Sequence, residues 1–146
     1  MEIKTIAMAA DHAGYKMKET VKRWLKSEGY DIKDFGTNSE ESTDYPDYAH
    51  PMAEFVESGG AQLGYTFCGS GNGISMTANK HQGIRSALCW QEELAALARQ
   101  HNDANVCSIP ARFVSEEKGL SIAKTFLESD FEGGRHQRRV DKIAIK

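Results

Sequence analysis

Short apolar runs alternate with amphipathic segments along most of this chain, and this alternation narrows its possible folds more than any other feature. The apolar runs predict strands at residues 3–10, 30–35, 63–67, 84–88 and 106–109. Apolar residues at helical spacing predict helices after residue 14 and at residues 48–58, 74–80, 91–101 and 116–128. Strands that alternate with helices favour an α/β fold, in which helices cover both faces of a parallel sheet.

Length and charge exclude several classes of protein. The 146 residues fit a single domain, 1–146, and no apolar run approaches the roughly 20 residues that span a bilayer. The formal net charge of −3 gives no general attraction to nucleic acid. The first residues carry no signal-peptide pattern, so we expect a cytoplasmic protein that binds neither nucleic acid nor a membrane.

The cysteines, Cys68, Cys89 and Cys107, are widely spaced and include no C-x-x-C pair. This spacing suits neither a disulfide framework nor a zinc site. We therefore expect reduced thiols, most of them buried.

A glycine-rich segment follows the third predicted strand: Cys68-Gly69-Ser70-Gly71-Asn72-Gly73. Parallel sheets bind ligands beyond the carboxyl ends of their strands, and glycines let a ligand approach the backbone. The N–H groups at the start of the next helix would attract a phosphate or an enediolate oxygen. The segment is not a dinucleotide fingerprint or a C-x5-R phosphatase loop, because Ile74 occupies the diagnostic position of each. It is not a P-loop, because no Gly-Lys-Ser/Thr follows.

The thiol of Cys68 is predicted to lie at the N-terminus of that next helix. This location lowers the pKa of a thiol below its ordinary value of about 8.5. A thiolate here could act as a nucleophile or as a general base. The alternative is a buried cysteine at a strand end that has no chemical role.

None of the histidines has the local spacing of metal ligands, so we expect no metal site. His12 follows the first strand beside Asp11, where the two either contact a substrate or form a turn that the carboxylate caps. His101 falls on the apolar face of its helix and precedes Asn102 and Asp103. It is either a hydrogen-bonded core histidine or an acid–base group.

The most basic stretch of the chain is residues 133–139. If it is helical, Arg135 and Arg139 share one face, and two guanidinium groups on one face suit a phosphate. The alternative is a solvated basic tail.

Distinctive short segments occur in order along nearly the whole chain. They are Ala10-Asp11-His12-Ala13-Gly14, Thr43-Asp44-Tyr45-Pro46, the segment 68–73, Ala78-Asn79-Lys80, Gly83-Ile84-Arg85, Arg99-Gln100-His101-Asn102-Asp103, Asn105-Val106 and Gly133-Gly134-Arg135-His136. Together they resemble the ribose-5-phosphate isomerase type B family, which includes galactose-6-phosphate isomerase subunits and allose-6-phosphate isomerases.

The resemblance implies a Rossmann-like three-layer α/β/α sandwich with a five-stranded parallel sheet. It implies a homodimer or homotetramer whose active site lies between two subunits, and it implies no metal or organic cofactor. A C-terminal helical segment, about residues 135–146, would pack on the partner subunit.

The resemblance also implies roles for individual residues. Cys68 would be the base that moves a proton between C1 and C2, and Ser70 would help to move protons between the substrate oxygens. His101 would help to open the sugar ring, with Asp11 on the hydroxyls and ring oxygen. The remaining contacts would be Gly69, Gly71, Asn72 and Gly73 at the enediolate, Asn102 elsewhere on the substrate, and His12, Arg112, Arg135 and Arg139 on the phosphate.

These roles imply an aldose–ketose isomerase that interconverts ribose 5-phosphate and ribulose 5-phosphate, a reaction of the pentose phosphate pathway. Some members of the family use a glutamate as the base at the position of Ser75, so this chain resembles the cysteine-using branch. Two alternatives stay open. One is an isomerase of another sugar or sugar phosphate, such as allose 6-phosphate or galactose 6-phosphate, and the other is a non-catalytic ligand-binding module.

Overall fold

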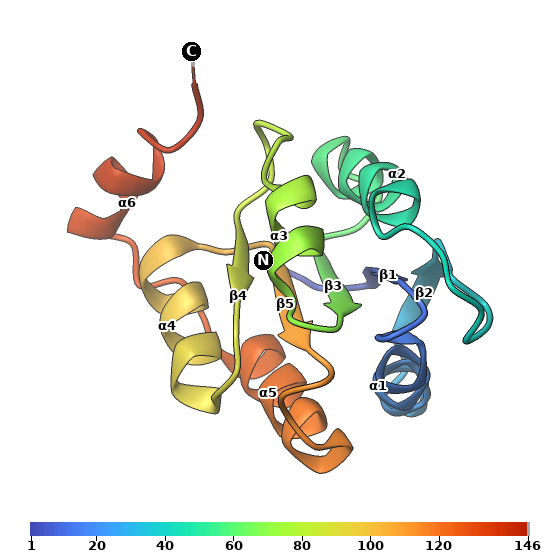
Figure 1. Cartoon of the computed structure of the whole chain (residues 1–146). Helices are drawn as coiled ribbons and strands as arrows, with labels where there is room; N and C mark the ends of the chain where they lie inside the picture. Colours follow the sequence, from blue (N-terminus) through green and yellow to red (C-terminus); the bar gives the residue numbers. More distant parts are fainter. Residues whose placement is uncertain (146) are drawn as a thin grey trace.

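A computed structural model describes residues 1–145 and has the α/β architecture that the alternating pattern predicts (Figure 1). Within these residues the strands are β1 (Thr5–Ala10), β2 (Asp31–Asp34), β3 (Leu63–Cys68), β4 (Ser86–Leu88) and β5 (Val106–Pro110). The helices are α1 (Tyr15–Ser27), α2 (Pro46–Glu57), α3 (Asn72–Ala78), α4 (Glu92–Asn102), α5 (Glu116–Glu128) and α6 (Arg135–Val140). The strands form one sheet in the order β2-β1-β3-β5-β4, and every neighbouring pair is parallel.

The central strands lie between two layers of helices. All residues of β3 and β5 are buried, as expected for strands that are covered on both faces. On one face, α1, α4 and α5 pack against the sheet through side chains that include Val21, Ala98 and Phe126. On the other face, α2 and α3 pack through side chains that include Met52 and Ala78. The predicted three-layer sandwich is therefore confirmed.

The register places the carboxyl ends of β1, β3 and β5 side by side. Ala10 lies opposite Phe67, and Cys68 lies opposite Pro110. The residues that follow these strands therefore meet at one edge of the sheet, which is the edge where parallel sheets bind ligands.

Some elements begin or end at other residues than the sequence predicts. α2 begins at Pro46 instead of residue 48, because the fixed φ of proline suits the first turn of a helix. α3 begins at Asn72 instead of residue 74, directly after Gly71 in a left-handed conformation. The glycine-rich loop is therefore shorter than the sequence indicates, and its last two residues belong to α3.

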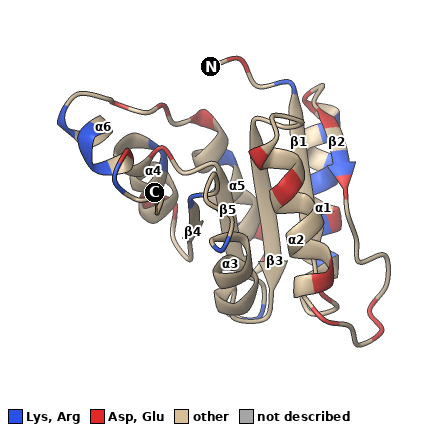
Figure 2. Cartoon of the chain, turned by 90° about the horizontal axis from the view of Figure 1, so that it is seen from above, with Lys and Arg blue, Asp and Glu red and all other residues tan. Residues whose placement is uncertain are grey.

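The basic stretch near the C-terminus forms α6, which lies outside the sandwich beside α4 (Figure 1). α6 carries Arg135, Arg138 and Arg139, and Figure 2 shows the resulting basic region at one end of the molecule. Neither α6 nor any other helix within residues 1–145 combines the length and the apolar character that crossing a membrane requires.

Candidate active site

Cys68 ends β3 and begins the loop that leads into α3. Two backbone hydrogen bonds tie this loop to the segment that follows β5. The N–H of Ala111 donates to the carbonyl oxygen of Cys68 at 2.9 Å, and the N–H of Arg112 donates to that of Gly69 at 3.0 Å. The loop and Arg112 are thereby held side by side at the carboxyl edge of the sheet.

Two glycines let neighbouring segments of the chain pack closer together at this edge than a larger residue would allow. Gly71 has a φ of +76°, and a Cβ there would lie 2.4 Å from Cδ1 of Leu88. At Gly14, just before α1, a Cβ would lie 2.3 Å from the carbonyl oxygen of Phe67. The start of α1 therefore packs directly against the end of β3, and this contact brings Asp11 to the loop.

These segments border an open pocket of about 430 Å³, a volume that suits a small ligand. It is lined by Asp11, Tyr45, Cys68, Gly69, Ser70, Gly73, Arg112 and Phe113. A neighbouring pocket of about 360 Å³ shares Ser70 and Phe113 with the first and is also lined by Asn72. Most of the residues predicted at the carboxyl edge therefore do gather there.

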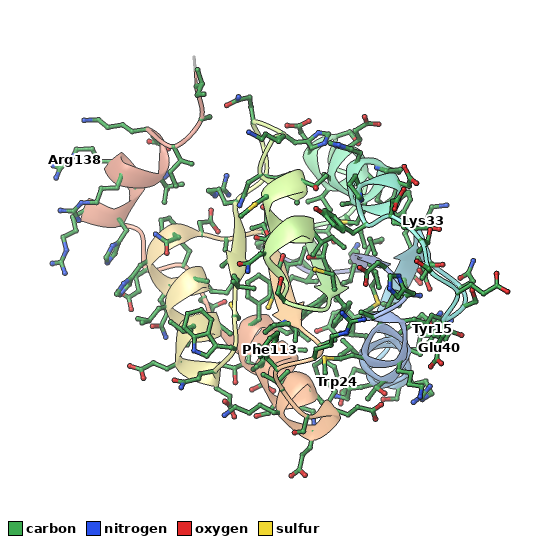
Figure 3. All side chains as sticks on the ribbon, in the orientation of Figure 1. Tyr15, Trp24, Lys33, Glu40, Phe113 and Arg138 are labelled. Carbon is green, nitrogen blue, oxygen red and sulfur yellow. The ribbon has the colours of Figure 1, made fainter. Side chains whose placement is uncertain are left out.

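Two aromatic residues that no sequence pattern singles out as site residues also line the first pocket. Tyr45 packs its ring so closely on the loop that a Cβ at Gly73 would lie 2.4 Å from its Cζ. Phe113 follows β5 and is largely exposed (Figure 3). Neither residue belongs to a familiar catalytic motif. The segment 43–46, which carries part of the family resemblance, is the signal that could have identified Tyr45.

Asp11 both caps a turn and lines the pocket. Its Oδ1 accepts hydrogen bonds from the backbone N–H groups of Ala13 at 3.0 Å and Gly14 at 3.1 Å. The adjacent His12 accepts a hydrogen bond at Nδ1 from the backbone N–H of Thr43 at 3.2 Å. In neutral His12, Nε2 is therefore the ring nitrogen that carries the proton.

The pKa of the Cys68 thiol is raised above its ordinary value, so the sequence-based expectation of a lowered pKa is wrong. Burial of the thiol is the largest cause, and the charge of Asp11 also raises the pKa. Hydrogen bonding to the backbone N–H groups of Ile74, Gly71 and Ser70 lowers the pKa without outweighing burial. The start of α3 thus acts in the predicted direction, and the expectation failed because it left out desolvation.

A second group of predicted site residues lies on α4 and α6. His101 and Asn102 end α4, and Arg135 and Arg139 are exposed on α6. The side chain of His101 is 42 % exposed, so it is not the core histidine that its helical face allowed. Its ring stacks on the ring of His136 from α6, with the ring centroids 4.3 Å apart.

The second group does not reach the Cys68 pocket within one chain. α4 ends at Asn102, shortly before the first residue of β5, so its end lies near the amino end of that strand. Cys68 lies opposite Pro110, the last residue of β5. A five-residue strand spans about 13 Å at roughly 3.3 Å per residue, which is too far for both groups to act on adjacent carbon atoms. Figure 1 likewise places α6 away from the carboxyl ends of the strands.

A buried arginine fixes the helix end that carries His101 and Asn102. Nη1 of Arg99 donates to Oδ1 of Asp103 at 2.9 Å and to the carbonyl oxygen of Ala104 at 2.6 Å. Asp103 has a φ of 46°, a left-handed conformation that ends α4. His101 and Asn102 therefore lie on an anchored turn rather than on a fraying helix end.

The other cysteines and Ser75 lie outside the pocket. Cys89 and Cys107 are buried free thiols, as the cysteine spacing predicts. Ser75 is buried, and its hydroxyl lies 2.9 Å from the hydroxyl of Ser86. This residue therefore has a structural partner and does not face the ligand pocket.

One group of potential metal ligands combines residues that are distant in sequence. Within residues 1–145, His101, Glu132 and His136 place their ligand atoms within 4.8 Å of one another. The expectation of no metal site rests on local histidine spacing and on the family resemblance, and neither of them reveals this group.

Comparisons with known proteins agree on one family. The family model described as Ribose/Galactose Isomerase matches residues 6–143. The chain is 43 % identical over 141 residues to ribose-5-phosphate isomerase B of Escherichia coli. The alignment covers 97 % of this chain and 95 % of that protein.

Solved structures give the same result. A ribose 5-phosphate isomerase from Thermotoga maritima superposes with a TM-score of 0.94 at 45 % identity, covering 99 % of each chain. Ribose-5-phosphate isomerase B from Mycoplasma genitalium with bound ribulose-5-phosphate superposes with a TM-score of 0.92 at 42 % identity, covering 95 % of this chain and 93 % of that one. Other relatives, at 36 % and 39 % identity, are named only as sugar phosphate isomerases.

Proposed function

The chain belongs to the ribose/galactose isomerase family of sugar-phosphate isomerases, and we propose that its reaction is the interconversion of ribose 5-phosphate and ribulose 5-phosphate. The observation that carries this proposal is the pocket in which the Cys68 thiol lies beside Asp11, Arg112 and the backbone of the glycine-rich loop. It combines a base, a hydroxyl-binding carboxylate and an anion site. The similarity to proteins named for this substrate, at 42–45 % identity, supports the choice of sugar.

In the proposed reaction, His101 and Asp11 open the furanose ring. The thiolate of Cys68 removes the C2 proton of the aldose, and the electron pair moves to the oxygen on C1. The enediolate oxygen lies against backbone N–H groups of the loop 69–73. The thiol returns the proton to C1, while Ser70 helps a proton pass between the two substrate oxygens, and the ketose forms.

Typical rate factors indicate how much each of these groups contributes to catalysis. A positioned general base is worth about 10²–10⁴-fold in rate, and a backbone donor to a developing oxyanion about 10²–10³-fold. The phosphate lies far from the atoms that react. Its contacts with His12 and the three arginines, Arg112, Arg135 and Arg139, therefore mainly position the sugar.

A second copy of the chain completes the site in this proposal. A twofold pair would place His101, Asn102, Arg135 and Arg139 of one subunit over the pocket of the other, and symmetry then gives two identical sites. Phe113 and Trp90, which are 76 % and 49 % exposed, lie beside the pocket and suit burial in such an interface. The segment 135–146 is the part that we expect to pack on the partner.

The rate should rise with pH if the Cys68 thiolate is the reactive form. Below the pKa of a thiol, the thiolate fraction grows about tenfold per pH unit. Because the pKa of Cys68 is raised, we expect kcat/KM to climb at nearly this slope from about pH 7 to pH 8.5. Initial rates in buffers of constant ionic strength measure this profile, and a flat profile would contradict a thiolate base with a raised pKa.

A substrate panel tests the choice of sugar. We expect kcat/KM for ribose 5-phosphate to exceed that for allose 6-phosphate and galactose 6-phosphate by about tenfold or more, the discrimination that one carbon unit typically gives. Unphosphorylated ribose, measured in the same assay, tests whether the arginines bind the phosphate of the substrate. A higher value for a six-carbon substrate would replace the proposed sugar, and no turnover of any substrate would favour the ligand-binding module.

A further inference from the structure

His101, Glu132 and His136 form a compact group at the junction of α4 and α6. Nε2 of His101 lies 3.8 Å from Oε1 of Glu132, and Nε2 of His136 lies 3.6 Å from the same oxygen. The two imidazole rings are nearly parallel, with an angle of 11° between their planes. The two ring nitrogens and the carboxylate oxygen thus lie within 4.8 Å of one another.

The donor set suits a borderline divalent cation. Zn²⁺ binds imidazole nitrogen and carboxylate oxygen at about 2.0–2.2 Å, so the ligand atoms of a tetrahedral site lie roughly 3.4 Å apart. The two nitrogen–oxygen separations, 3.6 and 3.8 Å, exceed this spacing by only a few tenths of an ångström, and all the ligand atoms lie within 4.8 Å of one another. Two histidines and one carboxylate also leave a fourth position open for water or an anion. Mg²⁺ prefers oxygen ligands and is the natural comparison ion.

The surrounding backbone holds the group while allowing the adjustment that binding needs. The backbone N–H of Glu132 donates to the carbonyl oxygen of Gln100 at 3.0 Å, which fixes Glu132 against α4. Gly133 and Gly134, both with positive φ, separate Glu132 from His136. Glycine at these positions lets α6 turn relative to α4, and the stacked rings can then tilt so that both nitrogens face one ion. The side chain of Glu132 is 53 % exposed, so an ion can enter from solvent.

We propose that His101, Glu132 and His136 bind Zn²⁺ or a similar borderline cation, and that the bound ion inhibits the isomerase. Coordination occupies the lone pair of His101, so the imidazole can no longer transfer a proton during ring opening. The inhibitory part rests on the proposed function, because it assigns His101 to that step. The binding part depends only on the geometry of the three side chains.

Binding is measured by titrating the full-length protein with Zn²⁺ in a calorimeter. The variant Glu132→Gln keeps the shape of the side chain and removes its charge. Glu128→Gln, at an exposed glutamate near the end of α5, is the matched control. We expect Glu132→Gln to weaken Zn²⁺ binding by about tenfold or more, Glu128→Gln to leave it unchanged, and Mg²⁺ to bind neither protein tightly. Equal Zn²⁺ affinity in wild type and Glu132→Gln would overturn the site.

Two other places on the chain could bind Zn²⁺, and further variants distinguish them from the proposed site. The thiol of Cys68 is removed by Cys68→Ala, and the pair formed by Nδ1 of His50 and Nε2 of His81, 2.8 Å apart, is removed by His50→Gln. We expect both variants to retain the Zn²⁺ site that Glu132→Gln weakens. If either one abolishes binding, the ion lies elsewhere and the proposal is wrong.

Inhibition is measured as the ratio of rates with and without Zn²⁺ for each protein, and a chelator should restore the starting rate. The inhibition constant should rise in Glu132→Gln by the same factor as the dissociation constant. An unchanged inhibition constant would overturn the inhibitory part. If the protein turns over no sugar phosphate at all, the proposed function fails, and the calorimetric titration still decides whether the metal site exists.

Discussion

Replacement of Cys68 by alanine should lower kcat for ribose 5-phosphate by about 10²–10⁴-fold while the fold stays intact, because the variant loses the group that carries the proton. Cys68→Ser should be nearly as inactive, since a serine hydroxyl is far too weak an acid to supply an anion near neutral pH. KM should change little, because the phosphate contacts and Asp11 remain. Steady-state rates, together with circular dichroism and a thermal melt, measure both activity and fold.

Cys89→Ala provides the matched control for this prediction. Cys89 is also a buried free thiol, but it belongs to the core that α1, α4 and α5 form with the sheet. Its replacement should reduce thermal stability somewhat and leave kcat close to that of the wild type. A Cys68→Ala protein that is folded and turns over at a near-normal rate would remove Cys68 from the role of base.

Two inactive variants should restore activity to each other when their subunits are mixed. Cys68→Ala and His101→Asn should each lose about 10²–10⁴-fold in kcat as homodimers. In a mixed dimer, one of the two sites receives the intact thiol from one subunit and the intact imidazole from the other. Random pairing makes half of the dimers mixed, so the mixture should regain about a quarter of wild-type activity.

The control for this experiment pairs two changes in one pocket. Cys68 and Asp11 line the same pocket of the same chain. Mixed dimers of Cys68→Ala and Asp11→Asn therefore contain no intact site and should stay inactive. If Cys68→Ala and His101→Asn also fail to restore activity when their subunits exchange, the proposal of a site shared between two subunits is wrong.

Much of the fold follows from the sequence for a simple physical reason. β1, β3 and β5 are covered on both faces, so their sequences are mostly apolar runs that stand out from the chain. β4 is an edge strand with only half-buried residues, and its predicted start at residue 84 is two residues early. The start of α3 depends on the left-handed conformation of Gly71, a local geometry that an apolar pattern does not contain.

The pocket was predictable in part. Asp11 and Ser70 follow strand ends and Cys68 ends β3, and the rule that parallel sheets bind ligands at their carboxyl edge brings them together. Tyr45 and Phe113 enter the pocket from loops whose course depends on tertiary packing. The direction of the Cys68 pKa shift was also beyond the sequence, because burial of the thiol outweighs the start of α3 only in the folded chain.

The separation of the two groups of site residues follows from topology. A helix that connects two parallel strands runs back along the sheet, so the end of α4 cannot lie beside the end of β3. His101 therefore cannot join the Cys68 pocket of its own chain, and neither can Arg135, because α6 lies beside α4 (Figure 1). This arrangement agrees with the sequence-based expectation of a site between subunits, which stays a prediction.

The most direct test of the account follows hydrogen exchange at the substrate carbon in heavy water. Ribose 5-phosphate is incubated with the protein in D₂O, and the products are analysed by NMR and mass spectrometry. We predict that the wild type forms ribulose 5-phosphate and introduces deuterium at the carbon that gains the proton, whereas Cys68→Ala introduces almost none. Labelling by Cys68→Ala at the wild-type rate, or a folded wild type that neither isomerises nor labels the sugar, would contradict the account.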